Sequence, residues 1–193
     1  MKELSLNILD IVQNSIRAEA NEISIMINES QSKDFYQIII RDNGKGIPED
    51  ILRIVTDPFV TTRTKRRMGL GLSLLKYHAE LTGGGLEINS MVGKGTEVKV
   101  NFSFRHIDRQ PLGDIAGVLV ILMAANKDIN FIYDHKTENG QYRFSSMETK
   151  EFLEVEALSE MNLLEEIGWM IGENLKEIKV SGFELRERNK VIL

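Results

Sequence analysis

Residues 4–27 read LSLNILDIVQNSIRAEANEISIMI, and this stretch contains two hydrophobic periods. Its first part repeats large apolar side chains every three to four residues, which predicts an amphipathic helix over residues 2–19. In its last part every second residue is isoleucine, which predicts a strand over residues 22–29 with one buried face. A helix that leads directly into a half-buried strand indicates a layered α/β fold in which helices cover a sheet.

Outward from this stretch, the pattern continues to about residue 105. Further strands are expected at residues 36–41, from Leu86 onward and at 96–104, and further helices at 49–54 and 70–82. The order of helix, two strands, helix and two strands predicts a two-layer α/β sandwich. Its sheet is expected to be mixed but mostly antiparallel, with the helices on one face.

The remaining residues, 106–193, predict a small α+β module. We expect a helix over residues 111–126, a hairpin of 129–134 with 141–145, and at least one helix within 150–178. Two alternatives remain open for the apolar stripe of that last region. It either belongs to a regulatory or partner-binding module, or packs on the sheet as additional core; its members include Leu164, Ile167, Ile171 and Leu175.

Composition excludes several classes of function. The 193 residues carry a net charge of −5, and residues 1–104 are balanced, so the acidic excess lies in the tail and argues against nucleic-acid binding. The chain has no cysteine, which excludes disulfides and thiolate chemistry, and it has only three histidines. No apolar run approaches the ~20 residues of a membrane span, and the first residues do not resemble a signal peptide. We therefore expect a cytoplasmic protein that does not enter a membrane.

The polar face of the first predicted helix carries candidate site residues. Asn7, Asp10, Asn14 and Arg17 are spaced so that they form one stripe opposite the apolar arc. A solvated helix face is one interpretation. Because Asn and Asp are poor helix formers, the alternative is a site in which an amide oxygen contacts Mg²⁺ and an arginine contacts phosphate.

Two glycine-rich stretches suggest where a ligand would bind. DNGKGI at residues 42–47 is either a strand-ending turn or a place where backbone approaches a flat ligand, with a carboxylate available to an amino group. RTKRRMGLGLSLLK at residues 63–76 is either a basic loop before a helix or a phosphate site formed by a helix start and nearby cations. No Walker sequence and no dinucleotide fingerprint occurs in the chain.

Together these motifs resemble the GHKL superfamily, which includes DNA gyrase, the heat-shock chaperones of ninety kilodaltons, histidine kinases and mismatch-repair ATPases. The resemblance covers residues 3–104 and rests on five motifs in order: Asp10-Ile-Val-Gln-Asn14-Ser, Asp42-Asn-Gly-Lys-Gly46-Ile, Asp57-Pro-Phe-Val-Thr-Thr62, Gly69-Leu-Gly-Leu72 and Gly93-Lys-Gly-Thr96. It implies the Bergerat ATP-binding fold for residues 1–105, with ATP and Mg²⁺ as cofactors.

The resemblance also implies a role for each matching residue. Asn14 is expected to coordinate Mg²⁺, Arg17 to touch phosphate, and Asp42 to bind the adenine amino group. The base pocket is expected to be shaped by Gly44, Gly46 and Ile47, with Thr96 in the water network beside Asp42. The phosphates are expected to meet backbone donors of Gly69, Leu70, Gly71 and Leu72, and lid residues Thr62 and Lys65, with Phe59 anchoring that lid.

Asp10 occupies the position of the general-base glutamate of the ATPase branch, and the shorter aspartate puts hydrolysis, although not ATP binding, in question. Two functions therefore stay open: a stand-alone kinase or anti-sigma-like regulator acting on a protein partner, and an ATP-driven switch with slow Asp10-dependent hydrolysis. We expect no phosphoacceptor helix before the nucleotide motifs. His78 is expected to be structural, and His106 and His135 to lie at the surface or in loops.

We predict that this 193-residue chain does not autophosphorylate on histidine, because none of its three histidines is placed as an acceptor. Incubation with terminally labelled ATP, followed by acid and base treatment, should leave no acid-labile phosphate on the protein. Mass-spectrometric detection of phosphate on His78, His106 or His135 would contradict the assignment.

Overall fold

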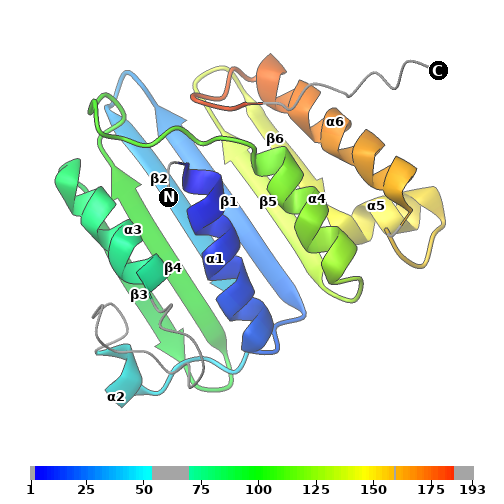
Figure 1. The fold of residues 1–193 in the computed structure, drawn as a ribbon, viewed down its shortest axis with the longest axis horizontal. Coiled ribbons are helices and arrows are strands. Elements are labelled where there is room, and N and C mark those ends of the chain that lie inside the picture. The colour runs from blue at the N-terminus through cyan, green and yellow to red at the C-terminus, as the bar shows by residue number, and fades with distance from the viewer. Residues whose placement is uncertain (1–2, 54–69, 159, 185–193) are drawn as a thin grey trace.

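The computed structural model describes residues 3–53, 70–158 and 160–184. Its elements follow the predicted order (Figure 1). They are α1 (Leu4–Arg17), β1 (Glu22–Ser30), β2 (Phe35–Asp42), α2 (Glu49–Leu52), α3 (Leu70–Leu81), β3 (Gly85–Met91), β4 (Gly95–Phe102), α4 (Ile115–Ala125), β5 (Asn130–Lys136), β6 (Gln141–Ser145), α5 (Ser146–Leu153) and α6 (Met161–Glu177).

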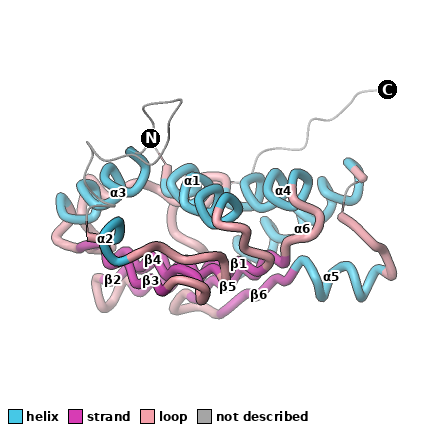
Figure 2. Tube along the Cα trace, turned by 90° about the horizontal axis from the view of Figure 1, so that it is seen from below, coloured by secondary structure: helices cyan, strands magenta, loops and turns pink. Residues whose placement is uncertain are grey.

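All six strands form one sheet, in the order β3-β4-β2-β1-β5-β6. Only the contact between β1 and β5 is parallel, and the other neighbours are antiparallel. The helices α1, α3, α4 and α6 lie over one face of this sheet and leave the opposite face uncovered (Figure 2). The expected two-layer, mostly antiparallel α/β sandwich is therefore confirmed.

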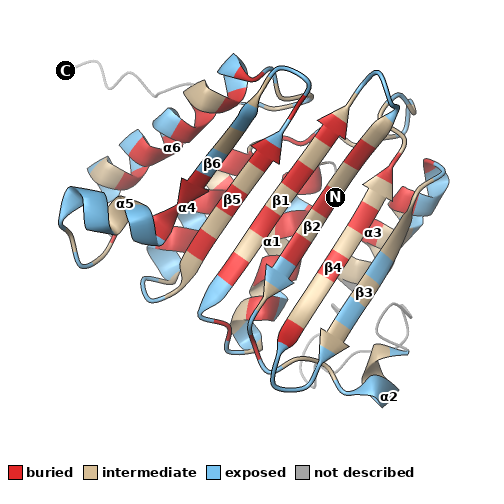
Figure 3. Cartoon of the chain, turned by 180° about the vertical axis from the view of Figure 1, so that it is seen from behind, coloured by how far each residue is buried: buried red, intermediate tan, exposed pale blue. Residues whose placement is uncertain are grey.

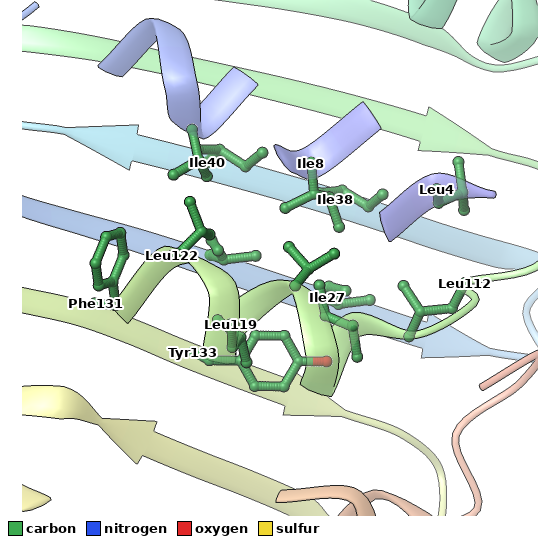
Figure 4. Packing of buried hydrophobic residues seen from close by; sticks show 14 of the residues in the cluster. Leu4, Ile8, Ile27, Ile38, Ile40, Leu112, Leu119, Leu122, Phe131 and Tyr133 are labelled. Carbon is green, nitrogen blue, oxygen red and sulfur yellow. The ribbon is translucent and has the colours of Figure 1, made fainter. Parts of the chain in front are cut away.

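The core lies between the sheet and the helices. Along β1, β2 and β4 every second side chain is buried, which is the period-2 pattern of a half-covered sheet (Figure 3). The apolar arc of α1 meets this surface, because Leu4, Ile8 and Val12 are almost fully buried. Close packing of α1 and α4 on the sheet forms one continuous apolar cluster (Figure 4).

The tail beyond residue 105 continues the same sheet. Strand β5 pairs with β1 over seven residues, and β6 extends the sheet to its far edge. Leu119 and Leu122 of α4 point toward Tyr133 and Phe131 of β5 (Figure 4). The apolar stripe of α6 is buried as well, so of the two alternatives for this stripe the structure supports the one in which it is additional core. Its buried members are Leu164, Ile167, Gly168, Ile171, Gly172 and Leu175. A division at residue 105 into separately folding units stays a prediction.

The segment before α4 also holds the first turn of α1. A helix begins with backbone N–H groups that lack partners within the helix. In α1, Leu4 N donates to the carbonyl of Pro111 at 3.0 Å, and Ser5 N donates to that of Leu112 at 2.9 Å. Gly113 N in turn donates to the carbonyl of Gly182 at 2.8 Å. The start of α1 and the end of the described chain are thus tied to one segment of the tail.

A group of buried polar side chains lies at the same end of the sheet. Glu29 accepts a hydrogen bond from Ser181 N at 2.8 Å, and its carboxylate lies 3.7 Å from His135 Nε2. The Tyr133 hydroxyl contacts His135 Nδ1 at 2.6 Å, and burial raises the pKa of Tyr133, which keeps it neutral. His135 is fully buried, so the expectation of a surface histidine was wrong: the alternation of β5 turns it toward the helices.

No helix in the described parts of the chain is both long enough and apolar enough to cross a membrane.

We predict that Leu119→Ala lowers the free energy of unfolding by about 2–5 kcal/mol, because it opens a cavity beneath α4. Ile121→Ala on the same helix is the matched control: this side chain is exposed, and the change should stay within about 0.5 kcal/mol. Urea unfolding monitored by circular dichroism should show a single transition, and its midpoint should lie at a lower urea concentration in Leu119→Ala than in the wild type. Two transitions, of which only one moves, would show that the tail folds separately.

Candidate functional site

Asp42 lies at the end of β2 and is held by three donors from three parts of the chain. Ser15 Oγ on α1 donates to its Oδ2 at 2.6 Å. Its Oδ1 accepts from Gly44 N at 3.0 Å and from Thr96 N on β4 at 3.2 Å. A sheet strand, a covering helix and a turn thus fix the orientation of one carboxylate.

These contacts define what else Asp42 can bind. An ionised carboxylate only accepts hydrogen bonds and has about four lone-pair sites. Three of them meet donors of the protein, namely Ser15, Gly44 and Thr96. The group is only partly buried, so the remaining capacity suits one further donor from a ligand, such as the amino group of adenine.

The glycines of two loops allow these loops to interlock beside Asp42. Gly46 has a φ of +71°, and a Cβ there would lie 2.2 Å from the Met91 carbonyl oxygen. Gly95 has a φ of +102°, and a Cβ there would lie 1.9 Å from the carbonyl oxygen of Asp42. The sequence suggested that glycines bring backbone close to a ligand. In the structure they first bring backbone close to backbone, since a side chain at either position would separate the loops.

A second hydroxyl connects these loops. Ser90 Oγ accepts from Ile47 N at 2.8 Å and donates to the Gly95 carbonyl at 2.9 Å, and it lies 2.9 Å from Thr96 Oγ1. Thr96 is the cross-strand neighbour of both Asp42 and Ser90. Sequence reasoning assigned no role to Ser90 or to Ser15. A polar residue on an apolar arc was the available signal for Ser15.

On α1 the other candidates face outward. Asp10 is partly exposed, and Asn14 and Arg17 are exposed. Arg17 Nη1 donates to Asn14 Oδ1 at 2.9 Å, so these two side chains share the predicted stripe. Asn7 departs from that prediction: it is buried, and its Nδ2 donates to Gln110 Oε1 at 3.2 Å. Its position on the helix turns it toward the tail and away from solvent.

The first turn of α3 lies against Asp10. A Cβ on Gly71 would be 2.7 Å from Asp10 Oδ2, so a side chain there would displace the carboxylate from its present position. Leu72 is partly buried and packs on the core. The remaining expectations, for Phe59, Thr62, Lys65 and Gly69, fall outside the described residues, as does the side chain of Leu70.

On the uncovered face of the sheet, the cross-strand pair next to Asp42 and Thr96 is an ion pair between Arg41 and Glu97. Arg41 Nε donates to Glu97 Oε2, and this hydrogen bond is the main reason why the pKa of Glu97 is lowered. Glu97 therefore stays ionised on the far side of β4, next to Thr96 in sequence but on the opposite face.

The fold and this carboxylate-centred site define a nucleotide-binding α/β sandwich of the GHKL type. The chain belongs to the family of histidine kinase-, DNA gyrase B- and HSP90-like ATPases, whose family model matches residues 2–106. This membership places it in the ATP-binding, kinase-like class.

Curated relatives match about half of the chain or less. A sensor histidine kinase of the NtrY-like type from Rickettsia conorii is 30% identical over 109 residues, which cover 56% of this chain and 18% of the relative. Sporulation kinase D of Bacillus subtilis is 33% identical over 95 residues, which cover 48% and 18%. The sensor kinase CckA of Brucella abortus is 40% identical over 68 residues, covering 35% and 7%. The chain thus spans less than a fifth of the length of these relatives.

A solved structure shares the fold. The N-terminal domain of a DNA repair protein superposes with a TM-score of 0.52 and 20% identity, covering 75% of this chain and 52% of that chain. The 75% of this chain that superposes is more than the family model matches, because that model covers only residues 2–106. Part of the tail beyond residue 106 therefore also has a counterpart in that fold.

We predict that Asp42→Asn weakens ATP binding by about 1–3 kcal/mol. The amide replaces one acceptor oxygen by a donor group, which then faces the protein's donors or the adenine amino group. Isothermal titration calorimetry checks this, with circular dichroism to confirm folding. Asp34→Asn is the matched control, because Asp34 binds Ser103 and Arg105 N instead. Equal ATP affinity in wild type and Asp42→Asn would remove Asp42 from the adenine site.

Proposed function

We propose that this chain binds ATP with Mg²⁺ and acts on a protein partner, as a stand-alone kinase or anti-sigma-like regulator. The observation that carries this proposal is the Asp42 carboxylate, which three protein donors orient and which keeps capacity for a fourth donor. The adenine amino group is that donor. Similarity to sensor kinases supports the phosphotransfer part.

The residues along α1 fit a metal–phosphate unit. Asn14 offers a neutral oxygen on the exposed side of the helix, where its neighbour Arg17 carries the positive charge. Oxygen ligands of this kind suit Mg²⁺, which when bound neutralises charge on the phosphates. In this assignment Asn14 holds the metal, Arg17 contacts a phosphate, and the first backbone N–H groups of α3 contact the others.

Asp10 has the role of the base. It lies one helical turn before Asn14 on α1 and against Gly71 at the start of α3, so it is near the phosphate end of the site. In the kinase reaction, a bond forms between the terminal phosphorus and an acceptor oxygen or nitrogen of the partner while the bond to ADP breaks. Asp10 takes the proton of the acceptor.

The second candidate function is an ATP-driven conformational switch without phosphotransfer. The same contact between Asp10 and Gly71 favours it, because a carboxylate beside the phosphate-binding turn can also orient a water. Aspartate reaches less far than glutamate, and a misplacement of about 1 Å costs about 10²-fold in rate. Such hydrolysis would be slow and would serve to reset the switch.

We further propose a cytoplasmic location and no direct contact with nucleic acid or membrane. The net charge of −5 supports this, because nucleic acids and anionic membrane surfaces repel an acidic protein.

We predict that Asp10→Asn keeps ATP affinity within about twofold and lowers turnover by about 10²-fold or more. Terminally labelled ATP, incubated with the protein and a cell lysate, separates the two candidates: label on one other protein indicates a kinase, and free phosphate alone indicates a switch. Asp128→Asn, on an exposed turn, is the matched control. Unchanged turnover in Asp10→Asn would exclude Asp10 as the base.

A further inference from the structure

The outer face of α6 lies opposite the stripe that is buried against the rest of the molecule. Its inner face already meets α4, and a Cβ on Gly168 would lie 2.8 Å from Val120 Cγ2, so the two helices are in close contact. Turned away from this contact are Glu165, Glu166, Trp169 and Met170, all of them exposed. We call these four residues the acidic docking face.

Exposed apolar side chains concentrate in this part of the molecule. Among the described residues, thirteen large apolar side chains are exposed, and six of them lie between residues 147 and 170. Phe152 of α5 is 83% exposed, Met161 of α6 is 68% exposed, and Trp169 is 45% exposed. Single exposed apolar residues are ordinary, but a concentration of large ones marks a contact surface. In Figure 3, α5 and the outer side of α6 form the exposed edge of the molecule beyond β6.

The charge of this region defines what it can contact. Residues 146–177 contain nine glutamates and two lysines. Both lysines are engaged, since Lys150 Nζ donates to the Lys127 carbonyl at 2.5 Å and Lys176 pairs with Glu173 at 2.8 Å. Within the described part of the chain, Glu165 and Glu166 have no ion-pair partner. The surface therefore repels nucleic acid and anionic lipid and attracts a cationic partner.

Helical spacing brings the apolar and acidic side chains together. Glu165 and Trp169 are four residues apart on α6, so they neighbour each other on one stripe, and Glu166 and Met170 form the next. An indole beside a carboxylate suits a lysine or arginine, which gains both the ion pair and the ring contact. The adjacent Met170 can adapt to apolar side chains of different shapes.

We propose that the acidic docking face binds a lysine- or arginine-rich amphipathic segment of a partner protein. The apolar side of that segment packs on Trp169 and Met170, and its cations meet Glu165 and Glu166. This inference does not rest on the proposed nucleotide chemistry. The face lies at the β6 edge of the sheet, whereas Asp42 lies at the end of β2, which β5 and β1 separate from β6 (Figure 1).

Trp169 allows a direct test, because it is the only tryptophan of the chain. The probe is a synthetic amphipathic helix of lysine and leucine, titrated into the full-length protein without nucleotide. We expect a saturable shift of the Trp169 emission to shorter wavelength, weakened by added salt. The same peptide with glutamate in place of lysine should produce no shift.

Two double variants with the same change in net charge locate the contact. Glu165→Lys with Glu166→Lys should weaken binding at least about tenfold. Glu80→Lys with Glu87→Lys, on exposed positions of α3 and β3 at the opposite edge of the sheet, should weaken it less than about twofold. In addition, Trp169→Ala should weaken binding about tenfold or more, measured by anisotropy of a labelled peptide. Circular dichroism confirms that each variant folds.

Several outcomes would overturn the proposal. If both double variants weaken binding equally, the attraction is a general effect of net charge. If the emission does not shift, or if Trp169→Ala binds like the wild type, the apolar part of the face makes no contact. If the emission shifts with protein concentration alone, a second copy of this chain occupies the face.

Discussion

The carboxylate of Asp42 is the constraint on which the arrangement of the candidate site depends. It accepts from Ser15 of α1, from Gly44 in the following turn and from Thr96 of β4. A partly buried carboxylate with these donors sets the distance between the helix layer and the sheet at one point. The position of α1 follows from it, and with α1 the position of Asp10 and Asn14.

The other end of α1 is held by the tail. Its first N–H groups donate to the carbonyls of Pro111 and Leu112, and Asn7 reaches Gln110. The helix that carries the candidate catalytic and metal-binding residues is therefore held at one end by Asp42 and at the other end by the tail. Any movement of the tail would act on α1 directly, which would give a physical route from the proposed acidic docking face on α6 to the candidate site.

Much of the first half was predictable, because regular hydrophobic periods report which face of each element is buried. The alternation in β1, β2 and β4 and the apolar arc of α1 appear in the structure as expected. Within the site, Asp42, Gly44 and Thr96 were identified from motifs, and the structure brings them within hydrogen-bonding distance. Ser90 was not identified, because a serine on a strand carries no signal until its partner is known. Ser15 was not identified either, although a polar residue on the apolar arc of α1 was a signal.

By itself the sequence determined the element order, the layer architecture and the motif positions, since these depend on local periodicity and on residue type. Tertiary structure alone decided where the tail goes. Strand β5 pairs in parallel with β1 across a separation of about a hundred residues, and no local pattern encodes which edge of a sheet a distant strand will join. The same pairing buries His135 and α6's apolar stripe, because the side of the sheet that a side chain faces depends on register, and register is a property of the assembled sheet.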